Sequence, residues 1–148
     1  MTDPSDVAAV KAANTALYDA FETGDIDLMG AVWLDDDGPV EVTCVHPGWA
    51  PVHGRGAVLR SWSMIMANTA YIQFVLTDVH VHVSGDVAVV TCGENMLTGM
   101  PEAPGDDSLP GFVGGRAVAT NVLRRTPAGW RLWVHHASPV LAQQSEAG

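Results

Sequence analysis

The sequence predicts an α+β domain in which three N-terminal helices cover one face of a long, curved antiparallel sheet. Apolar residues recur at helical spacing in three segments before residue 70, and they alternate in long runs after it. Short turns join these runs into an antiparallel meander, and helices segregate to one side of such a sheet. At 148 residues the chain fits a single domain, 1–148, with a core over about 5–140 and a flexible tail over 141–148.

Capping residues predict where the helices begin and end. Asp3 before Pro4 is a good N-cap, and Gly24-Asp25 ends the first helix and opens the second. The second helix is expected from roughly Ile26 to Leu34. A third is expected over about 55–68, with Trp62 on its buried side.

Alternating apolar residues predict five strands. They are expected over 40–46, 71–83, 87–97, 116–125 and 130–138, with hairpin turns at 84–86 and 126–129. Proline lacks the N–H donor that a ladder needs, so Pro47 ends the first strand. The segment 98–115 has no period, and a long loop of this kind is often a lid or a binding loop.

Composition excludes several classes of partner. The formal charge is −10, from 7 Lys and Arg against 17 Asp and Glu, so binding to nucleic acid or to anionic membranes is not expected. No apolar run reaches the roughly 18–20 residues of a membrane helix, and the acidic N-terminus does not resemble a signal peptide. We therefore expect a cytoplasmic protein. Cys44 and Cys92 lie in expected strands and are interpreted as inert core thiols.

Three stretches resemble the SnoaL-like domains of the nuclear-transport-factor-2-like (NTF2-like) superfamily. They are 18–25 (YDAFETGD), 54–58 (GRGAV) and 129–139 (GWRLWVHHASP). The resemblance spans roughly residues 7–140 and implies a cone, in which a bent sheet closes over the helices around a pocket. Dimers through the outer face of the sheet are frequent in this superfamily, so we expect a homodimer through that face, with a small-molecule ligand in the pocket. Its members include isomerases, cyclases, dehydratases, epoxide hydrolases and non-catalytic modules, so the fold does not name the function.

Ketosteroid isomerases, which look like distant relatives, use a strand-one aspartate as the proton shuttle, with a tyrosine and a protonated aspartic acid as oxyanion donors. The shuttle position falls on Glu41 or Val42, and the tyrosine position falls one residue before Tyr18. The aspartic acid position falls on Asn121. Trp62 falls at an aromatic position that lines the isomerase site. These departures argue against steroid isomerase chemistry as such.

Several polar residues interrupt apolar segments and are candidate site residues. Asn121 lies in an apolar strand, where its amide either donates to a ligand oxygen or pins a neighbouring side chain. His46 ends the first strand and is either a general base or a residue that fixes the following loop. Asn14 interrupts the stripe of the first helix, where it either reaches the pocket or makes a structural hydrogen bond, and Tyr18 of the same helix is a further candidate ligand-binding residue. Glu94 is a candidate acid or base if its strand face is inward, and ordinary surface if it is outward.

His135 and His136 are adjacent on the last strand and point to opposite faces. Counting by twos from Trp130 places His136 on the apolar face, so we expect His136 to be the inner one. His80, His82 and Asp78 share another strand face, which we interpret as a solvated polar face. We expect no functional metal.

Three tryptophans, Trp33, Trp49 and Trp62, are candidate pocket walls. The glycine-rich segment 111–115 precedes a strand rather than a helix, so it does not predict a phosphate site, and no cofactor is expected.

Two functions from different classes remain open. The first is a cofactor-free acid–base isomerase, cyclase or dehydratase that acts on a small, mainly apolar carbonyl compound. There, His46 with Glu94 or His136 moves protons, and Asn121 holds developing negative charge. The second is a non-catalytic ligand-binding or dimeric assembly module.

Overall fold

Helices and strands follow the expected order. The computed structural model describes residues 3–36, 40–99 and 112–140. In chain order the elements are α1 (Pro4–Thr23), α2 (Ile26–Val32), β1 (Thr43–Val45), β2 (Val52–His53), α3 (Arg55–Ala67), β3 (Ile72–Ser84), β4 (Val87–Gly99), β5 (Phe112–Thr126) and β6 (Gly129–Pro139). No helix in these ranges is long and apolar enough to cross a membrane.

Local capping chemistry sets the first two helices, as the sequence predicts. The Asp3 carboxylate accepts a hydrogen bond from the N–H of Ser5, and Pro4 occupies the first turn of α1. Gly24 ends α1 at φ 68°, a left-handed conformation that glycine adopts without a Cβ clash. The Asp25 carboxylate then caps α2 by accepting from two of its backbone N–H groups.

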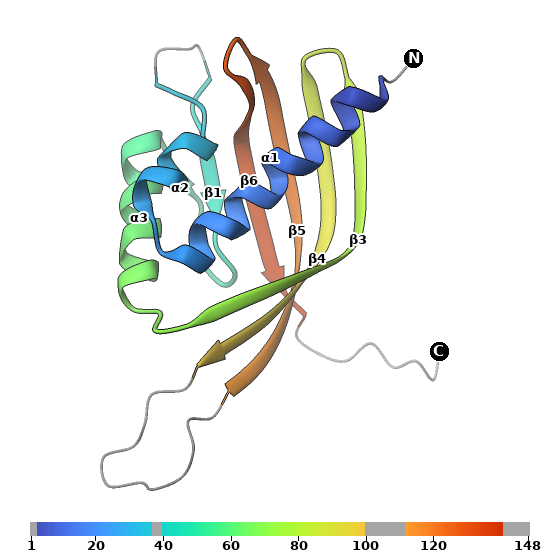
Figure 1. The fold of residues 1–148 in the computed structure, drawn as a ribbon. Helices are drawn as coiled ribbons and strands as arrows, with labels where there is room; N and C mark the ends of the chain where they lie inside the picture. The colour runs from blue at the N-terminus through green and yellow to red at the C-terminus, as the bar shows by residue number, and fades with distance from the viewer. Residues whose placement is uncertain (1–2, 37–39, 100–111, 141–148) are drawn as a thin grey trace, which may run out of the picture.

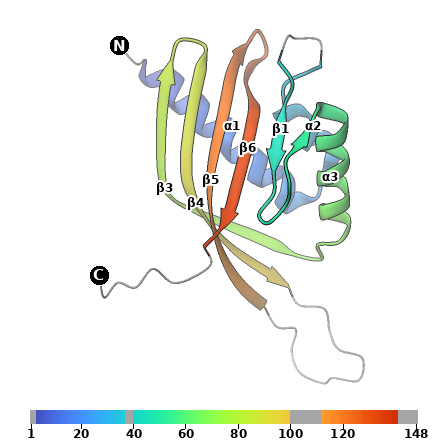
Figure 2. The same cartoon turned by 180° about the vertical axis from the view of Figure 1, so that it is seen from behind.

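All six strands form one open sheet in the order β2-β1-β6-β5-β4-β3. The four long strands β3 to β6 pair antiparallel, as expected. The short strand β1 pairs parallel with β6, so the sheet is mixed rather than wholly antiparallel. Figures 1 and 2 show α1 crossing one face of the long strands, with α2 and α3 stacked beside it on the same side. No helix of the described residues lies on the opposite face of the sheet.

Two β-bulges shift which residues point inward. In β3 the register shifts between Thr77 and His80, where Asp78 adopts φ 52°. The strand changes direction along its length in Figure 1, as bulged strands do. In the β5–β6 ladder, Val122 pairs with Val134 but Leu123 pairs with Leu132, so one β6 residue is extra.

Element boundaries differ from the predictions where tertiary pairing intervenes. The second helix ends at Val32 because Trp33 is extended and bridges to Leu132 of β6. The first strand has only three residues, and the two-residue strand β2, which the sequence did not predict, pairs with it. Residues 98–99 and 112–115 of the expected loop lie in β4 and β5. The rest of that loop and the tail lie outside the described residues.

Candidate functional site

Six buried polar side chains lie between the helices and the inner face of the sheet. Each is less than a tenth exposed: Asn14, His46, Ser61, Glu94, Asn121 and His135. The hydroxyl of buried Tyr18 bonds to two of them, and we call these seven residues the polar cluster. A buried polar group without a hydrogen bond costs a few kcal/mol, so the partners of each residue decide what it can do.

Asn121 of β5 is the centre of the cluster. Its Nδ2 donates to Oδ1 of Asn14 over 2.7 Å and to the hydroxyl of Tyr18 over 3.3 Å. Its Oδ1 accepts from Nδ1 of His135 over 2.5 Å. The sequence left two roles open for Asn121, a donor to a ligand and a residue that holds its neighbours in place. Its hydrogen bonds in the structure correspond to the second role. A ligand oxygen gains an Asn121 N–H only by displacing Asn14 or Tyr18.

Glu94 of β4 points inward and is 4% exposed. The Tyr18 hydroxyl donates to its Oε2 over 2.6 Å. Burial raises the pKa of Glu94, and the bond from Tyr18 only partly opposes this. Burial, followed by the charge of Glu94, raises the pKa of Tyr18 far above its usual range, so the phenol stays protonated. Glu94 is thus a carboxyl group whose pKa moves toward neutrality, as a general acid or base requires.

His135, not His136, is the inner histidine of β6. His135 is 2% exposed and bonds Asn121, whereas His136 is exposed. The expectation for His136 is wrong because the bulge places Trp133 as an extra residue between Leu132 and Val134. Counting by twos fails across one extra residue.

His46 follows β1, is 3% exposed, and bonds to α3. Its Nε2 lies 2.9 Å from Oγ of Ser61, and that hydroxyl donates to the carbonyl oxygen of Val58 over 2.7 Å. The Cys44 thiol lies 3.8 Å from its Nδ1. The sequence did not single out Ser61. Its position could have indicated a site residue, because Ser61 is polar and lies next to Trp62 on the buried side of the helix.

Burial keeps both inner histidines neutral. It lowers the pKa of His46 from 6.5 to about 4. It lowers the pKa of His135 from 6.5 to about 3, with a further contribution from the charge of His46. Both values lie well below neutral pH, so the two rings act as neutral imidazoles, each with one N–H and one lone pair.

Trp62 of α3 joins the two halves of the cluster. Its ring lies edge-on to His46, with centroids 4.6 Å apart, and tilted against His135 at 5.9 Å. Its indole N–H is buried and has no hydrogen-bond partner among the described residues. Burial raises the pKa of the Cys44 thiol to about 12, and the nearby indole N–H of Trp62 partly opposes this rise. A buried donor without a proper acceptor is available to a ligand.

The other two candidate tryptophans occupy different environments. Trp33 is 1% exposed and bridges to β6, and no described ring contact or hydrogen bond joins it to the cluster. Trp49 is 39% exposed and packs edge-on against His46 at 4.8 Å. Trp49 therefore contacts both the His46 ring and solvent.

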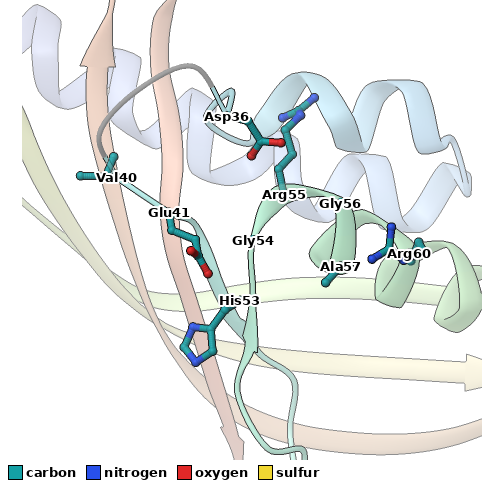
Figure 3. A pocket seen from close by; sticks show the side chains of 9 residues that line it. All are labelled: Asp36, Val40, Glu41, His53, Gly54, Arg55, Gly56, Ala57 and Arg60. Carbon is teal, nitrogen blue, oxygen red and sulfur yellow. The ribbon is translucent and has the colours of Figure 1, made fainter.

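A separate surface hollow of about 570 Å³ lies at the N-terminus of α3. Figure 3 shows Glu41 and His53 on one side of it and Arg60 on the other. Glu41 is exposed here, so one of the two positions matched to the isomerase proton shuttle lies outside the polar cluster. The other, Val42, is buried but cannot transfer a proton.

The remaining histidines give no metal site in the described ranges. No group of three or more His, Cys, Asp or Glu side chains is placed there to hold a metal ion. At the exposed face of β3, His80 bonds to Asp78 over 2.8 Å, while Val79, Val81 and Val83 pack against the core. This matches the solvated polar face that the sequence predicts.

Comparisons with known proteins agree with this architecture. The family model of the SnoaL-like domain matches residues 10–142. An NTF2-like protein from Streptomyces avermitilis, named "putative dehydratase", is 55% identical over 95% of this chain and 100% of its own, with a TM-score of 0.86. A Thiobacillus denitrificans protein, named "putative calcium/calmodulin-dependent protein kinase type II association domain", is 35% identical over 88% of this chain and 94% of its own, with a TM-score of 0.69.

More distant structures share the fold alone. A ketosteroid isomerase-like protein from Erwinia carotovora is 18% identical over 95% of this chain and 100% of its own, with a TM-score of 0.69. The comparison with curated proteins found no match. Because the family model covers most of the chain and the Streptomyces protein aligns over its full length, this chain belongs to the SnoaL-like family of NTF2-like proteins.

Proposed function

We propose that the polar cluster is an acid–base active site that acts, without a bound cofactor, on a small, mainly apolar carbonyl compound. The observation that carries the proposal is the buried carboxyl of Glu94, which Tyr18 holds and whose pKa burial raises. Environments that move a carboxyl pKa toward neutrality are typical of groups that transfer protons. The unpartnered N–H of Trp62 in the same region supports a site for a ligand oxygen.

Among isomerisation, cyclisation and dehydration, we favour dehydration. The 55% identical Streptomyces protein is named a "putative dehydratase", and one carboxyl suffices for this reaction. The Glu94 carboxylate takes the proton from the carbon next to the carbonyl of a β-hydroxy ketone. The resulting acid returns that proton to the departing β-hydroxyl. The C–H and C–O bonds break, a C=C bond forms, and water leaves.

The neighbours of Glu94 have supporting roles in this proposal. The Trp62 N–H donates to the carbonyl oxygen and stabilises the negative charge that develops there, the role first expected of Asn121. Asn121 instead orients Tyr18 and His135. Trp49 packs against His46 and is 39% exposed, so in this proposal it borders the entrance for a substrate.

The alternative is a non-catalytic ligand-binding or dimeric assembly module. One observation favours it: most polar groups of the cluster bond one another, as they do in a network that only specifies a core. The 35% identical protein named an association domain is consistent with this alternative.

Turnover of a model β-hydroxy ketone separates the two functions. We expect the protein to convert 4-hydroxy-4-phenylbutan-2-one, or a small aryl or alkyl analogue, to the conjugated enone, followed by ultraviolet absorbance. Glu94→Gln should lower kcat by about 10²-fold or more, because general acid–base catalysis contributes on this scale. Glu41→Gln, at an exposed carboxyl, is the matched control and should leave the rate unchanged. If neither 4-hydroxy-4-phenylbutan-2-one nor any of its analogues is converted, the result would favour the binding module.

A further inference from the structure

We propose that Ser61 and Asn121 hold His46 and His135 in opposite neutral tautomers, so that the cluster presents two nitrogen lone pairs and selects ligands that carry a hydroxyl group beside the carbonyl. This inference rests on the proposed function for its ligand, and it names the class of compound that the site takes. Ser61 and Asn121 are positioning residues in this view, because they act through the two imidazoles.

The tautomer of His46 follows from the hydrogen bonds of Ser61. The Ser61 Oγ lies 2.7 Å from the carbonyl oxygen of Val58, which can only accept, so the single hydroxyl proton points to Val58. The Oγ must then accept from His46 over 2.9 Å, and this requires a proton on Nε2. Nδ1 of His46 is left as a lone pair. The Cys44 thiol, a weak donor, lies 3.8 Å from Nδ1 and 3.6 Å from Nε2, so it does not distinguish the two nitrogens, whereas Ser61 does.

The tautomer of His135 follows from a chain that begins at Glu94. An ionised carboxylate only accepts, so Tyr18 donates to it, and the phenol oxygen accepts from the amide N–H of Asn121. The amide oxygen therefore faces His135 and requires a proton on Nδ1. Nε2 of His135 is left as a lone pair, and no hydrogen bond to it occurs within the described residues.

The hydrogen-bonding groups left for a ligand are thus mainly acceptors. Both N–H groups of Asn121 are used, and so are the hydroxyls of Tyr18 and Ser61. The groups left without a described partner include the indole N–H of Trp62, one lone pair on each of the two imidazoles beside the Trp62 ring, and the second carboxylate oxygen of Glu94. Burial raises the pKa of the Cys92 thiol, and the amide N–H side of Asn14, which faces that thiol, lowers it in part. A complementary ligand supplies one carbonyl oxygen to the indole and at least one O–H to an imidazole, on an otherwise apolar frame.

The tautomers can be measured on the unmodified protein. Long-range ¹H–¹⁵N correlation spectra at pH 7 distinguish a protonated ring nitrogen from a lone-pair nitrogen in each histidine. We expect protonation on Nε2 for His46 and on Nδ1 for His135. The same tautomer in both rings, or the reverse assignment in either, would overturn the proposal regardless of any catalytic activity.

The role of Ser61 has a matched control on the same helix. Ser61→Ala should convert His46 to a mixture of tautomers and leave His135 unchanged, because the two rings have separate partners. Ser61→Thr, which keeps the hydroxyl, should restore the wild-type tautomer, and Ser63→Ala, at an exposed position, should have no effect. An unchanged His46 spectrum in Ser61→Ala would show that Ser61 does not position the ring.

A pair of probe compounds tests the ligand class. 4-Hydroxyacetophenone and 4-methylacetophenone share the carbonyl and have similar size, but only the first carries an O–H donor. We expect the hydroxyl compound to bind about tenfold tighter and to shift a lone-pair ¹⁵N signal, because a site built for a hydroxyl rejects an analogue without one. Equal affinity, tighter binding of the methyl compound, or no shift of either imidazole would contradict the proposal. Hydroxyl-selective binding with no turnover would instead refute only the proposed catalysis.

Discussion

At the scale of single residues, the proposed site depends on the carboxyl group of Glu94, whose charged form is disfavoured by burial. Glu94 is 4% exposed, and its pKa is raised chiefly by burial. Below its ordinary pKa of 4.5, the folded and unfolded states both hold the proton. As pH rises, the unfolded chain ionises first, so the folded state loses stability until the folded pKa has been passed. Catalytic groups commonly carry such a cost.

Replacement of Glu94 by glutamine should therefore stabilise the fold while it removes the proton-transfer group. The Gln oxygen still accepts from Tyr18, so the hydrogen bond is kept. We expect Glu94→Gln to raise the free energy of unfolding by about 1–2 kcal/mol at pH 8 and to have little effect at pH 4, as measured by urea denaturation. A loss of stability at pH 8 would show that the carboxylate is better accommodated than its burial indicates.

At the scale of elements, Arg55 fixes α3 against the end of α2. Its guanidinium donates to the carbonyl oxygens of Gly30 at 2.8 Å, Trp33 at 3.0 Å and Leu34 at 3.1 Å. These carbonyls lie at or beyond the C-terminal end of α2, where the helix has no partners for them. The helix that carries Ser61 and Trp62 is held in place in this way.

Arg55→Lys should weaken this junction although the charge is kept. A lysine ammonium lacks the planar fork that reaches three carbonyls together, so buried acceptors lose their donors. We expect a loss of about 1–3 kcal/mol in the free energy of unfolding, measured by chemical denaturation. Arg60→Lys, at an exposed position on the same helix, is the control. Equal stability of the two variants would mean that the Arg55 bonds do not hold the helix.

At the scale of the whole molecule, the outer face of the sheet is partly apolar, and no helix among residues 3–36, 40–99 and 112–140 covers it. Val89, Val122 and Val134 pair in one row across β4, β5 and β6 on this face. Val75 and Val118 are 59% and 52% exposed. Apolar residues placed side by side on an uncovered face favour association with another surface. A homodimer through this face, as the family resemblance implies, remains our proposal.

Sedimentation tests the dimer directly. We expect a mass near twice 15.6 kDa at micromolar concentration for the wild-type chain. Val118→Glu should shift it to 15.6 kDa, because a carboxylate at an apolar contact must be desolvated without a partner. Lys11→Glu, which also makes the charge more negative but lies exposed on α1, should not dissociate it. A wild-type mass of 15.6 kDa would contradict the prediction.

Sequence patterns predicted the order of the three helices and of every strand except β2, the caps of α1 and α2, and several of the buried polar residues. These follow from local chemistry: Asp3 and Asp25 satisfy helix N–H groups, Gly24 adopts a left-handed conformation, and Asn14 and Asn121 stand out in apolar segments. The resemblance of three short stretches was enough to identify the family.

Tertiary contacts, by contrast, determine which polar side chains hydrogen-bond to one another and which donors and acceptors are left without a described partner. One extra residue in β6 reverses the alternation and places His135 inside instead of His136, and pairing rules from sequence do not locate a bulge. Asn121 bonds to Asn14, which is 107 residues away in the sequence. His46, which follows β1, bonds to Ser61 of α3. Hydrogen-bond direction depends on every partner in such a network, so the lone pairs that we propose for the ligand become visible only when the whole cluster is assembled.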